Sequence, residues 1–314
     1  MSARFDSRLD SIVDAVGNTP LVRLRHIGRE TPGVKIYLKL EYLNPGGSVK
    51  DRSALQMMRD AIADGRLTHD RTLIDSTSGN TGVAYALFCA ALGYRLTLVM
   101  PANLSQSRKN ITRAYGAELI FSDPMEGADG AIQHCRAIIA RDPAKYFYPD
   151  QYSNPSNPKA HYLGTGREIL EQIGGELTHF VAGMGTSGTI MGVTRRLKEH
   201  TRPITCVALE PAEALHGLEG LKHMGSSVVP GVYDPTVPDE ILPVGTDDGW
   251  AMAERLASEE GLHVGYSTGA NAHGALVLAR RLAARGETGC IVSVACDRGD
   301  RYLAAQRLEQ FYDW

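Results

Sequence analysis

A glycine-rich segment with closely spaced hydroxyl groups is the first candidate for chemistry. GTSGT, residues 185–189, follows the apolar run HFVAG and precedes a segment of helical period. Free N–H groups at a helix start and small side chains let phosphate oxygens approach the backbone, so this order is typical of an anion site. A purely structural tight turn is the alternative. The residues that would supply amides and hydroxyls are Gly185, Thr186, Ser187, Gly188 and Thr189.

The same segment also allows a dinucleotide site. Gly183, Gly185 and Gly188 fit the pattern GxGxxG after a strand, and Glu210 follows at about the distance of a ribose-binding acid. The hydroxyl-dense TSGT core favours a single phosphate monoester over a pyrophosphate. On this segment alone a nicotinamide-dependent oxidoreductase stays open.

A lysine supplies the second candidate. Lys50 stands in NPGGSVKDR, directly after an Asn-Pro-Gly-Gly turn and at the first turn of a predicted helix. A lysine amine in such a place can form a Schiff base with a carbonyl group. A solvated lysine paired with Asp51 is the alternative.

The third candidate is DSTSGNTG, which ends a predicted strand at Asp75 and opens an apolar helix. Its hydroxyls, amide and N–H groups are enough to hold a carboxylate, although mere helix capping gives the same pattern. Two anion-binding turns and one lysine suggest a ligand with two anionic ends, such as an amino acid joined to a phosphorylated cofactor. The polar residues of this turn are Thr77, Ser78, Asn80 and Thr81.

Strand-like and helix-like segments alternate along the chain, which predicts parallel sheets covered by helices on both faces. A Pro- and Asn-rich segment at 149–161 predicts a crossover between domains, and residues 224–243 predict a long surface loop near a site. The predicted strands are KIYLKL, TLID, RLTLVM, AELIFS, HFVAG, ITCVALE and CIVSVA. The predicted helices are 51–64, 81–92, 105–115, 125–140, 166–173, 189–199, 248–259 and 271–284.

Length and composition exclude several classes of protein. The 314 residues predict two α/β domains or one large domain, and the formal net charge of −3, without a basic stripe, argues against nucleic acid. The charged N-terminus has no signal-peptide core and no apolar run is long enough to span a bilayer, so we expect a cytoplasmic protein without a membrane helix. Five scattered cysteines predict neither a disulfide framework nor a metal site.

From GNTPLVRL at Gly17 to DRGDRYL at Asp297, the sequence resembles the cysteine synthases, which act on O-acetylserine or O-phosphoserine. They belong to the fold-type II pyridoxal-phosphate enzymes, which also contain cystathionine β-synthase. The resemblance implies a fold like that of the tryptophan synthase β-subunit: two three-layer α/β domains, mostly parallel sheets and the cofactor in the cleft between them. The smaller domain would be residues 44–155, carrying the lysine and TSGNTG, and the larger one 1–43 plus 156–314, carrying the phosphate loop.

By the same resemblance, pyridoxal 5′-phosphate is the cofactor and Lys50 is the Schiff-base lysine and general base. Asn80 would face the phenolic oxygen of the cofactor, residues 185–189 would hold its phosphate, and Ser267, in GYSTGAN, would face the pyridine nitrogen. From the sequence alone Ser267 is interpreted as a helix N-cap. The residues similar to the substrate-binding positions are Thr77, Ser78, Gly79, Thr81, Gln151 and Gly220.

Two positions depart from the usual pattern of that family. Lys222, in GLEGLKHMG, resembles the arginine of phosphoserine-using members, so we expect it, with His223 as a second candidate, to bind a leaving phosphate. Its alternative is a solvated loop lysine. Cys296 would lie near the pyridine ring, where a packed thiol is favoured over a reactive one.

The expected reaction is a β-replacement on activated L-serine with sulfide or another sulfur donor, giving L-cysteine. Cystathionine formation, or products such as diaminopropionate and cyanoalanine, remain alternatives. The resemblance also implies a homodimer, with serine acetyltransferase or a sulfur-carrier protein as further partners.

Overall fold

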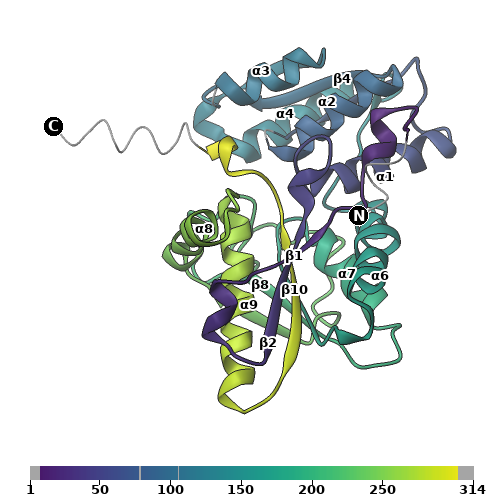
Figure 1. Ribbon diagram of the computed structural model, residues 1–314. Coiled ribbons are helices and arrows are strands. Elements are labelled where there is room, and N and C mark those ends of the chain that lie inside the picture. Colours follow the sequence, from purple (N-terminus) through teal and green to yellow (C-terminus); the bar gives the residue numbers. More distant parts are fainter. Residues whose placement is uncertain (1–7, 78, 105, 303–314) are drawn as a thin grey trace.

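Two β-sheets organise the protein. The computed structural model describes residues 8–77, 79–104 and 106–302, and Figure 1 shows one sheet with its helices above the other. Within this part of the chain the sheets have six and four strands. No helix of the described ranges combines the length and apolar character needed to cross a bilayer.

The larger sheet has the strand order β1-β2-β10-β7-β8-β9. All neighbouring strands run parallel except β1 and β2, which are antiparallel with Val22 opposite Leu38. The strands are β1 (Leu21–Arg23), β2 (Val34–Leu40), β7 (His179–Gly183), β8 (Thr205–Pro211), β9 (Glu240–Val244) and β10 (Gly289–Ala295).

Helices cover both faces of this sheet. α8 (Thr246–Glu260) and α9 (Tyr266–Ala284) lie on one side, and α6 (Arg167–Ile173) and α7 (Gly188–Leu197) lie on the other, as Figure 1 shows. Because side chains alternate along a strand, Val181 joins the core beneath α9, whereas its neighbour Phe180 joins the core beneath α7. The three central residues of β7, from Phe180 to Ala182, are therefore buried and apolar.

The smaller sheet, in the order β5-β4-β3-β6, is parallel throughout. Its two faces also carry separate cores, with Leu73 and Leu98 in one and Ile74 and Val99 in the other. The strands are β3 (Thr72–Asp75), β4 (Arg95–Pro101), β5 (Glu118–Ser122) and β6 (Tyr146–Phe147). The helices around them are α1 (Lys50–Ala63), α2 (Asn80–Leu92), α3 (Gln106–Ala114) and α4 (Gly127–Arg141).

The predicted fold class is confirmed: the described residues form two mostly parallel α/β sheets covered by helices. The predicted crossover contains α5 (Ser156–Ala160), which continues into a π-helical turn, His161–Gly166. The predicted loop 224–243 is wrong at its end, because Glu240–Val244 pairs with β8 as β9.

The prediction of a helix from 271 is wrong at its start. α9 begins five residues earlier, at Tyr266, with Gly265 as its N-cap. Ser267 therefore lies inside the first turn, and its interpretation as an N-cap is incorrect. Tyr, Ser, Thr and Gly hide the helical period there, because packing against α8 rather than propensity stabilises this turn.

Candidate active site

A cleft of about 420 Å³ lies where β3, β7 and β10 end and where α1, α2, α7 and α9 begin. Parallel sheets bind ligands at the carboxyl ends of their strands, and the volume falls within the roughly 300–1,000 Å³ usual for cofactor sites. Most of the residues predicted from the sequence line it: Lys50, Thr77, Gly79, Asn80, Thr81, Gln151, Gly185, Thr186, Ser187, Thr189, Gly220, Lys222 and Ser267. Gly188, in the same loop, is not among the lining residues, and Ser78 is outside the described residues.

Lys50 is the first residue of α1, and it faces this cleft. The loop before it is fixed to the segment after β10, since the Val49 N–H donates to the Cys296 carbonyl at 2.8 Å. Ser48 forms an isolated β-bridge with Asp297. The backbone that carries the Lys50 amine is thus fixed on one side by helix α1 and on the other side by this bridge.

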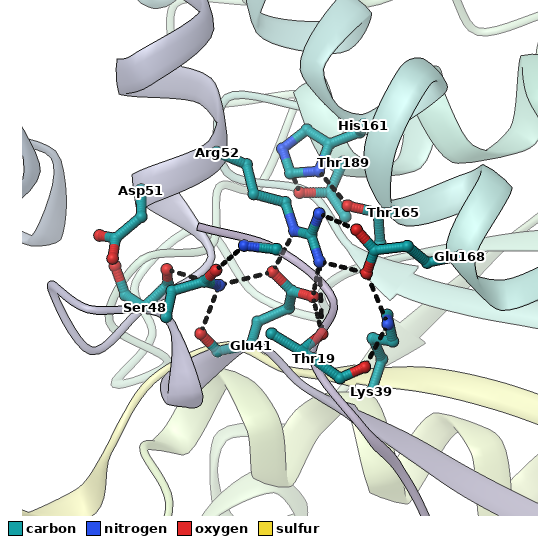
Figure 2. A network of polar contacts seen from close by, with 12 residues as sticks. Thr19, Lys39, Glu41, Ser48, Asp51, Arg52, His161, Thr165, Glu168 and Thr189 are labelled. Carbon is teal, nitrogen blue, oxygen red and sulfur yellow. Dashed lines mark hydrogen bonds and ion pairs between the residues drawn. The ribbon is translucent and has the colours of Figure 1, made fainter. Parts of the chain in front are cut away.

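A buried ionic network anchors the same turn of α1 (Figure 2). The Arg52 guanidinium donates to Glu41 at 2.6 Å and to Glu168 at 2.7 Å, and Lys39 lies 2.8 Å from Glu168. Two cations face two carboxylates, so the charges balance in a region closed to water. Burial raises the pKa of Glu168, but the ion pairs and hydrogen bonds outweigh it and hold the pKa below its usual value.

The predicted phosphate cup lies at the N-terminus of α7. Ser187 adopts a left-handed backbone with φ of 67°, and its buried hydroxyl has no hydrogen-bond partner among the described residues. Asn157 Nδ2 donates to the Thr186 hydroxyl at 3.0 Å, and His161 Nε2 lies 3.3 Å from the Thr189 hydroxyl. An unsatisfied hydroxyl and open helix N–H groups fit an anion, so these residues fit the phosphate of pyridoxal phosphate.

Two glycines of this cup leave no room for a side chain. A Cβ on Gly188 would lie 1.9 Å from Asn157 Oδ1, and one on Gly185 would lie 2.2 Å from the Gly220 carbonyl. The Asn157 side chain at Gly188 and the Gly220 backbone carbonyl at Gly185 leave no space for a Cβ, which explains why glycine occupies both positions.

His161, which the sequence analysis did not select, supports the cup from the π-helical turn. Burial, with a smaller effect of the Arg52 charge, lowers the pKa of His161 to about 3. The imidazole is therefore neutral at physiological pH and contacts Thr165 and Thr189, as Figure 2 shows. His161 lies in the segment HYLGTG, and nothing in this local sequence indicated its role.

The predicted carboxylate turn lies at the start of α2, opposite the cup. The Thr81 hydroxyl donates to Gln151 Oε1 at 2.9 Å. This contact joins the turn after β3 to the crossover segment, although 70 residues separate the two positions. Thr77 and Gly79 also face the cleft, so the hydroxyls and N–H groups expected for a carboxylate are brought together.

The residues that follow β10 are a part of the cleft that sequence reasoning missed. Asp297, Arg301 and Tyr302 line it beside Lys50, and the Asp297 carboxylate accepts from Asn80 at 2.7 Å and from Tyr302 at 2.6 Å. DRGDRYL contributed to the resemblance, but nothing in its pattern indicated which neighbours these side chains contact.

The remaining predicted residues take distinct positions. Lys222 Nζ lies 5.0 Å from the centroid of the Tyr152 ring, within cation–π range, and lines the cleft. His223 does not line it, and its ring contacts Ser226 instead. Burial raises the pKa of the Cys296 thiol to about 11, which keeps it protonated and favours the packed role.

The dinucleotide alternative finds no support in this geometry. Glu210, the expected ribose-binding acid, accepts the Met224 N–H at 3.1 Å and is absent from the cleft lining. Within the described ranges, no group of three His, Cys, Asp or Glu side chains is arranged to hold a metal ion.

Comparison with known protein families agrees with the site. Residues 12–297 match the family of pyridoxal-phosphate dependent enzymes. This match covers well over half of the chain, and the chain belongs to that family. The expected cofactor, pyridoxal 5′-phosphate, is thereby confirmed.

Within that family the chain groups with the cysteine synthases. It is 49% identical over 296 residues to a cysteine synthase of Aquifex aeolicus, an alignment that covers 94% of this chain and 90% of that protein. The crystal structure of a cysteine synthase from Entamoeba histolytica matches with a TM-score of 0.92 and 37% identity, covering 98% of this chain and 93% of the other. An O-acetylserine dependent cystathionine β-synthase from Helicobacter pylori matches with a TM-score of 0.86 and 34% identity, covering 95% and 98%.

Proposed function

We propose that this enzyme replaces the leaving group on the β-carbon of O-acetyl- or O-phospho-L-serine by a sulfur nucleophile, giving L-cysteine. One observation carries the proposal: an amine, a phosphate cup and a carboxylate turn surround a single cleft. A substrate amino acid joined to a phosphorylated cofactor needs an amine that holds the cofactor, a site for the cofactor phosphate and a site for the substrate carboxylate. The kinship with cysteine synthases supports the same reaction.

The side chains divide the work by position. Pyridoxal phosphate supplies an electron sink that stabilises negative charge on the substrate α-carbon. Lys50 would hold the cofactor through its amine, and the same amine would take the substrate α-proton and return it. Asn80 would hold the phenolic oxygen of the cofactor, and the Ser267 hydroxyl would hold its pyridine nitrogen. Residues 185–189 hold the phosphate.

The substrate carboxylate is held by the turn at the start of α2. Its neutral hydroxyls and open N–H groups stabilise a carboxylate without introducing a competing charge. The residues that bind the carboxylate are Thr77, Ser78, Gly79, Thr81 and Gln151.

Lys222 and Gly220 lie on the side of the cleft where the leaving group departs. Lys222 Nζ lies over the Tyr152 ring and lines the cleft, so its ammonium can contact an anion bound there. A positive charge there favours a doubly charged phosphate over an acetate. We therefore assign Lys222 to the recognition of O-phospho-L-serine.

The visible spectrum of the purified enzyme tests this proposal. O-acetylserine or O-phosphoserine, added separately, should shift the yellow band of the bound cofactor, and subsequent sulfide should restore it with release of cysteine. Lys222→Ala should slow the half-reaction with phosphoserine about tenfold and leave acetylserine unchanged, whereas Lys222→Arg should keep the preference. An equal loss with both donors would contradict the assignment of Lys222.

The same experiment separates the alternatives. If homocysteine restores the band far faster than sulfide does, the enzyme is a cystathionine β-synthase, the activity of the Helicobacter pylori relative. Cyanide or an amine as the preferred nucleophile would indicate cyanoalanine or diaminopropionate formation.

The surroundings of the catalytic unit are part of the proposal. Residues 44–155 form the smaller domain, and 1–43 plus 156–314 form the larger one, with the cleft between them. The enzyme works as a homodimer in the cytoplasm, and serine acetyltransferase or a sulfur-carrier protein docks at the mouth of the cleft. Sedimentation of the pure protein, alone and with each partner, tests the homodimer and the docking of each partner.

A further inference from the structure

Both polar atoms of the Asn80 amide are held by the segment that follows β10. Asn80 Nδ2 donates to Asp297 Oδ2 at 2.7 Å, and the Arg301 guanidinium donates to Asn80 Oδ1. Guanidinium has no acceptor atom, so the amide oxygen must face Arg301. The amide therefore has one orientation, with its nitrogen toward Asp297.

The holding segment is itself well anchored. Asp297 is 1% exposed, and its carboxylate also accepts from the Tyr302 hydroxyl at 2.6 Å. The second Arg301 nitrogen donates to the Gly46 carbonyl, in the loop that leads to Lys50. The Tyr302 ring packs against Tyr266 with centroids 5.4 Å apart. These contacts leave little freedom for the side chains that face Asn80.

One N–H group of Asn80 remains for a ligand. An asparagine nitrogen carries two hydrogens, and among the described residues only Asp297 accepts from it. Asn80 lines the cleft together with Lys50. With the first hydrogen fixed on Asp297, the planarity of the amide determines the direction of the second one.

We propose that Asp297 and Arg301 are positioning residues, which orient the Asn80 amide so that its second N–H donates to the phenolic oxygen of the bound cofactor. The inference rests on the role of Asn80 proposed above. It assigns the segment after β10, otherwise without a part in the reaction, to the placement of the cofactor ring. A preset donor avoids the ordering cost of a mobile amide on binding.

Cofactor affinity tests this inference without relying on turnover. Apoprotein, prepared by removing the cofactor, is titrated with pyridoxal phosphate for the wild type, Asn80→Ala, Asp297→Ala, Asp297→Asn and the double variant Asn80→Ala/Asp297→Ala. Loss of a hydrogen bond to a charged oxygen should weaken binding roughly 10- to 100-fold in Asn80→Ala. Asp297→Ala should weaken cofactor binding about tenfold. In the Asn80→Ala background, the same substitution should weaken binding less than twofold further.

The conservative variant and a second readout exclude a merely structural effect. Asp297→Asn keeps an acceptor oxygen and should bind within about threefold of the wild type, because that oxygen still orients the Asn80 nitrogen. The pH midpoint of the visible cofactor band should move in Asp297→Ala in the same direction as in Asn80→Ala. Asp300→Asn is the matched control, since Asp300 lies in the same turn but is exposed and pairs with Arg298 at 3.3 Å.

If Asp297→Ala binds the cofactor with wild-type affinity and keeps the wild-type pH midpoint, while Asn80→Ala binds the cofactor more weakly, the positioning role alone is overturned. An unchanged Asn80→Ala contradicts the proposed role of Asn80 and with it the inference. If Asp297→Ala does not fold, the same cycle with the less buried Arg301→Met replaces it, and equal losses in both Asn80 backgrounds would overturn the inference.

Discussion

Arg52 and Glu168, 116 positions apart in the chain, form a two-pronged ion pair in which both carboxylate oxygens accept at 2.7 Å. The pair joins α1, which begins with Lys50, to α6 beneath the larger sheet. Both side chains are buried, and the buried Glu41 and Lys39 complete the network that neutralises their charges. The position of the catalytic amine thus depends on charges that do not line the cleft.

Arg52→Met should lower the free energy of unfolding by about 3–5 kcal/mol, because two buried carboxylates lose their principal partner. Urea denaturation measures the change. Arg66→Met removes an exposed pair with Asp64 and should cost less than about 1 kcal/mol. Equal losses in the two variants would show that burial of the Arg52 network adds nothing.

Gly188→Ala should weaken cofactor binding at least about tenfold. The new Cβ would displace Asn157, whose Nδ2 holds both the Gln151 carbonyl and the Thr186 hydroxyl of the cup. Alanine is the better helix former, so a loss of affinity cannot come from helix propensity. Titration of apoprotein with pyridoxal phosphate gives the constant. Gly28→Ala, where the added Cβ meets nothing, is the control.

Thr81→Val should lower kcat/KM for the activated serine roughly 10- to 100-fold, because it removes a hydroxyl from the carboxylate turn and leaves Gln151 without its donor. Valine keeps the shape of threonine, so the fold should persist. Steady-state kinetics with either donor supply the measurement. The yellow band should be unaltered, and its loss would place Thr81 at the cofactor instead of the substrate.

Asp75→Asn should change how stability depends on pH. Burial, reinforced by the Asp150 charge, raises the pKa of Asp75 to about 7, and Oδ2 has no partner in the described structure. The folded state therefore keeps a proton that the unfolded chain loses near pH 4. The stabilisation is complete below pH 4 and disappears as the pH rises toward 7.

Between pH 5 and 7 the wild type should accordingly lose about 1.4 kcal/mol per pH unit relative to Asp75→Asn. Urea unfolding at pH 5, 6 and 7 gives the two curves. Asp10→Asn, at an exposed position, should run parallel to the wild type. If the curve of Asp75→Asn also ran parallel to that of the wild type, the pKa of Asp75 would be the same in the folded and the unfolded state.

Sequence patterns predicted most of the parallel strands, because a strand buried on both faces is an apolar run of characteristic length. Some short strands were not predicted, because they do not form such a run. β1, β6 and β9 have two to five residues and lie at sheet edges, where partners decide the conformation. The early start of α9 shows the same effect, since its first turn is stabilised by packing.

The sequence by itself determined the chemistry available to this protein: a lysine after a tight turn, and two helix starts rich in glycine and hydroxyl groups. Each of these features is formed by residues that are adjacent in the sequence, so the sequence alone reveals it. Only the tertiary structure decided which distant side chains complete the site. The contacts of Asn80 with Asp297, of Thr81 with Gln151 and of Arg52 with Glu168 span 217, 70 and 116 positions. Their partners are fixed by how the two sheets meet, a property of the folded chain that no local pattern contains.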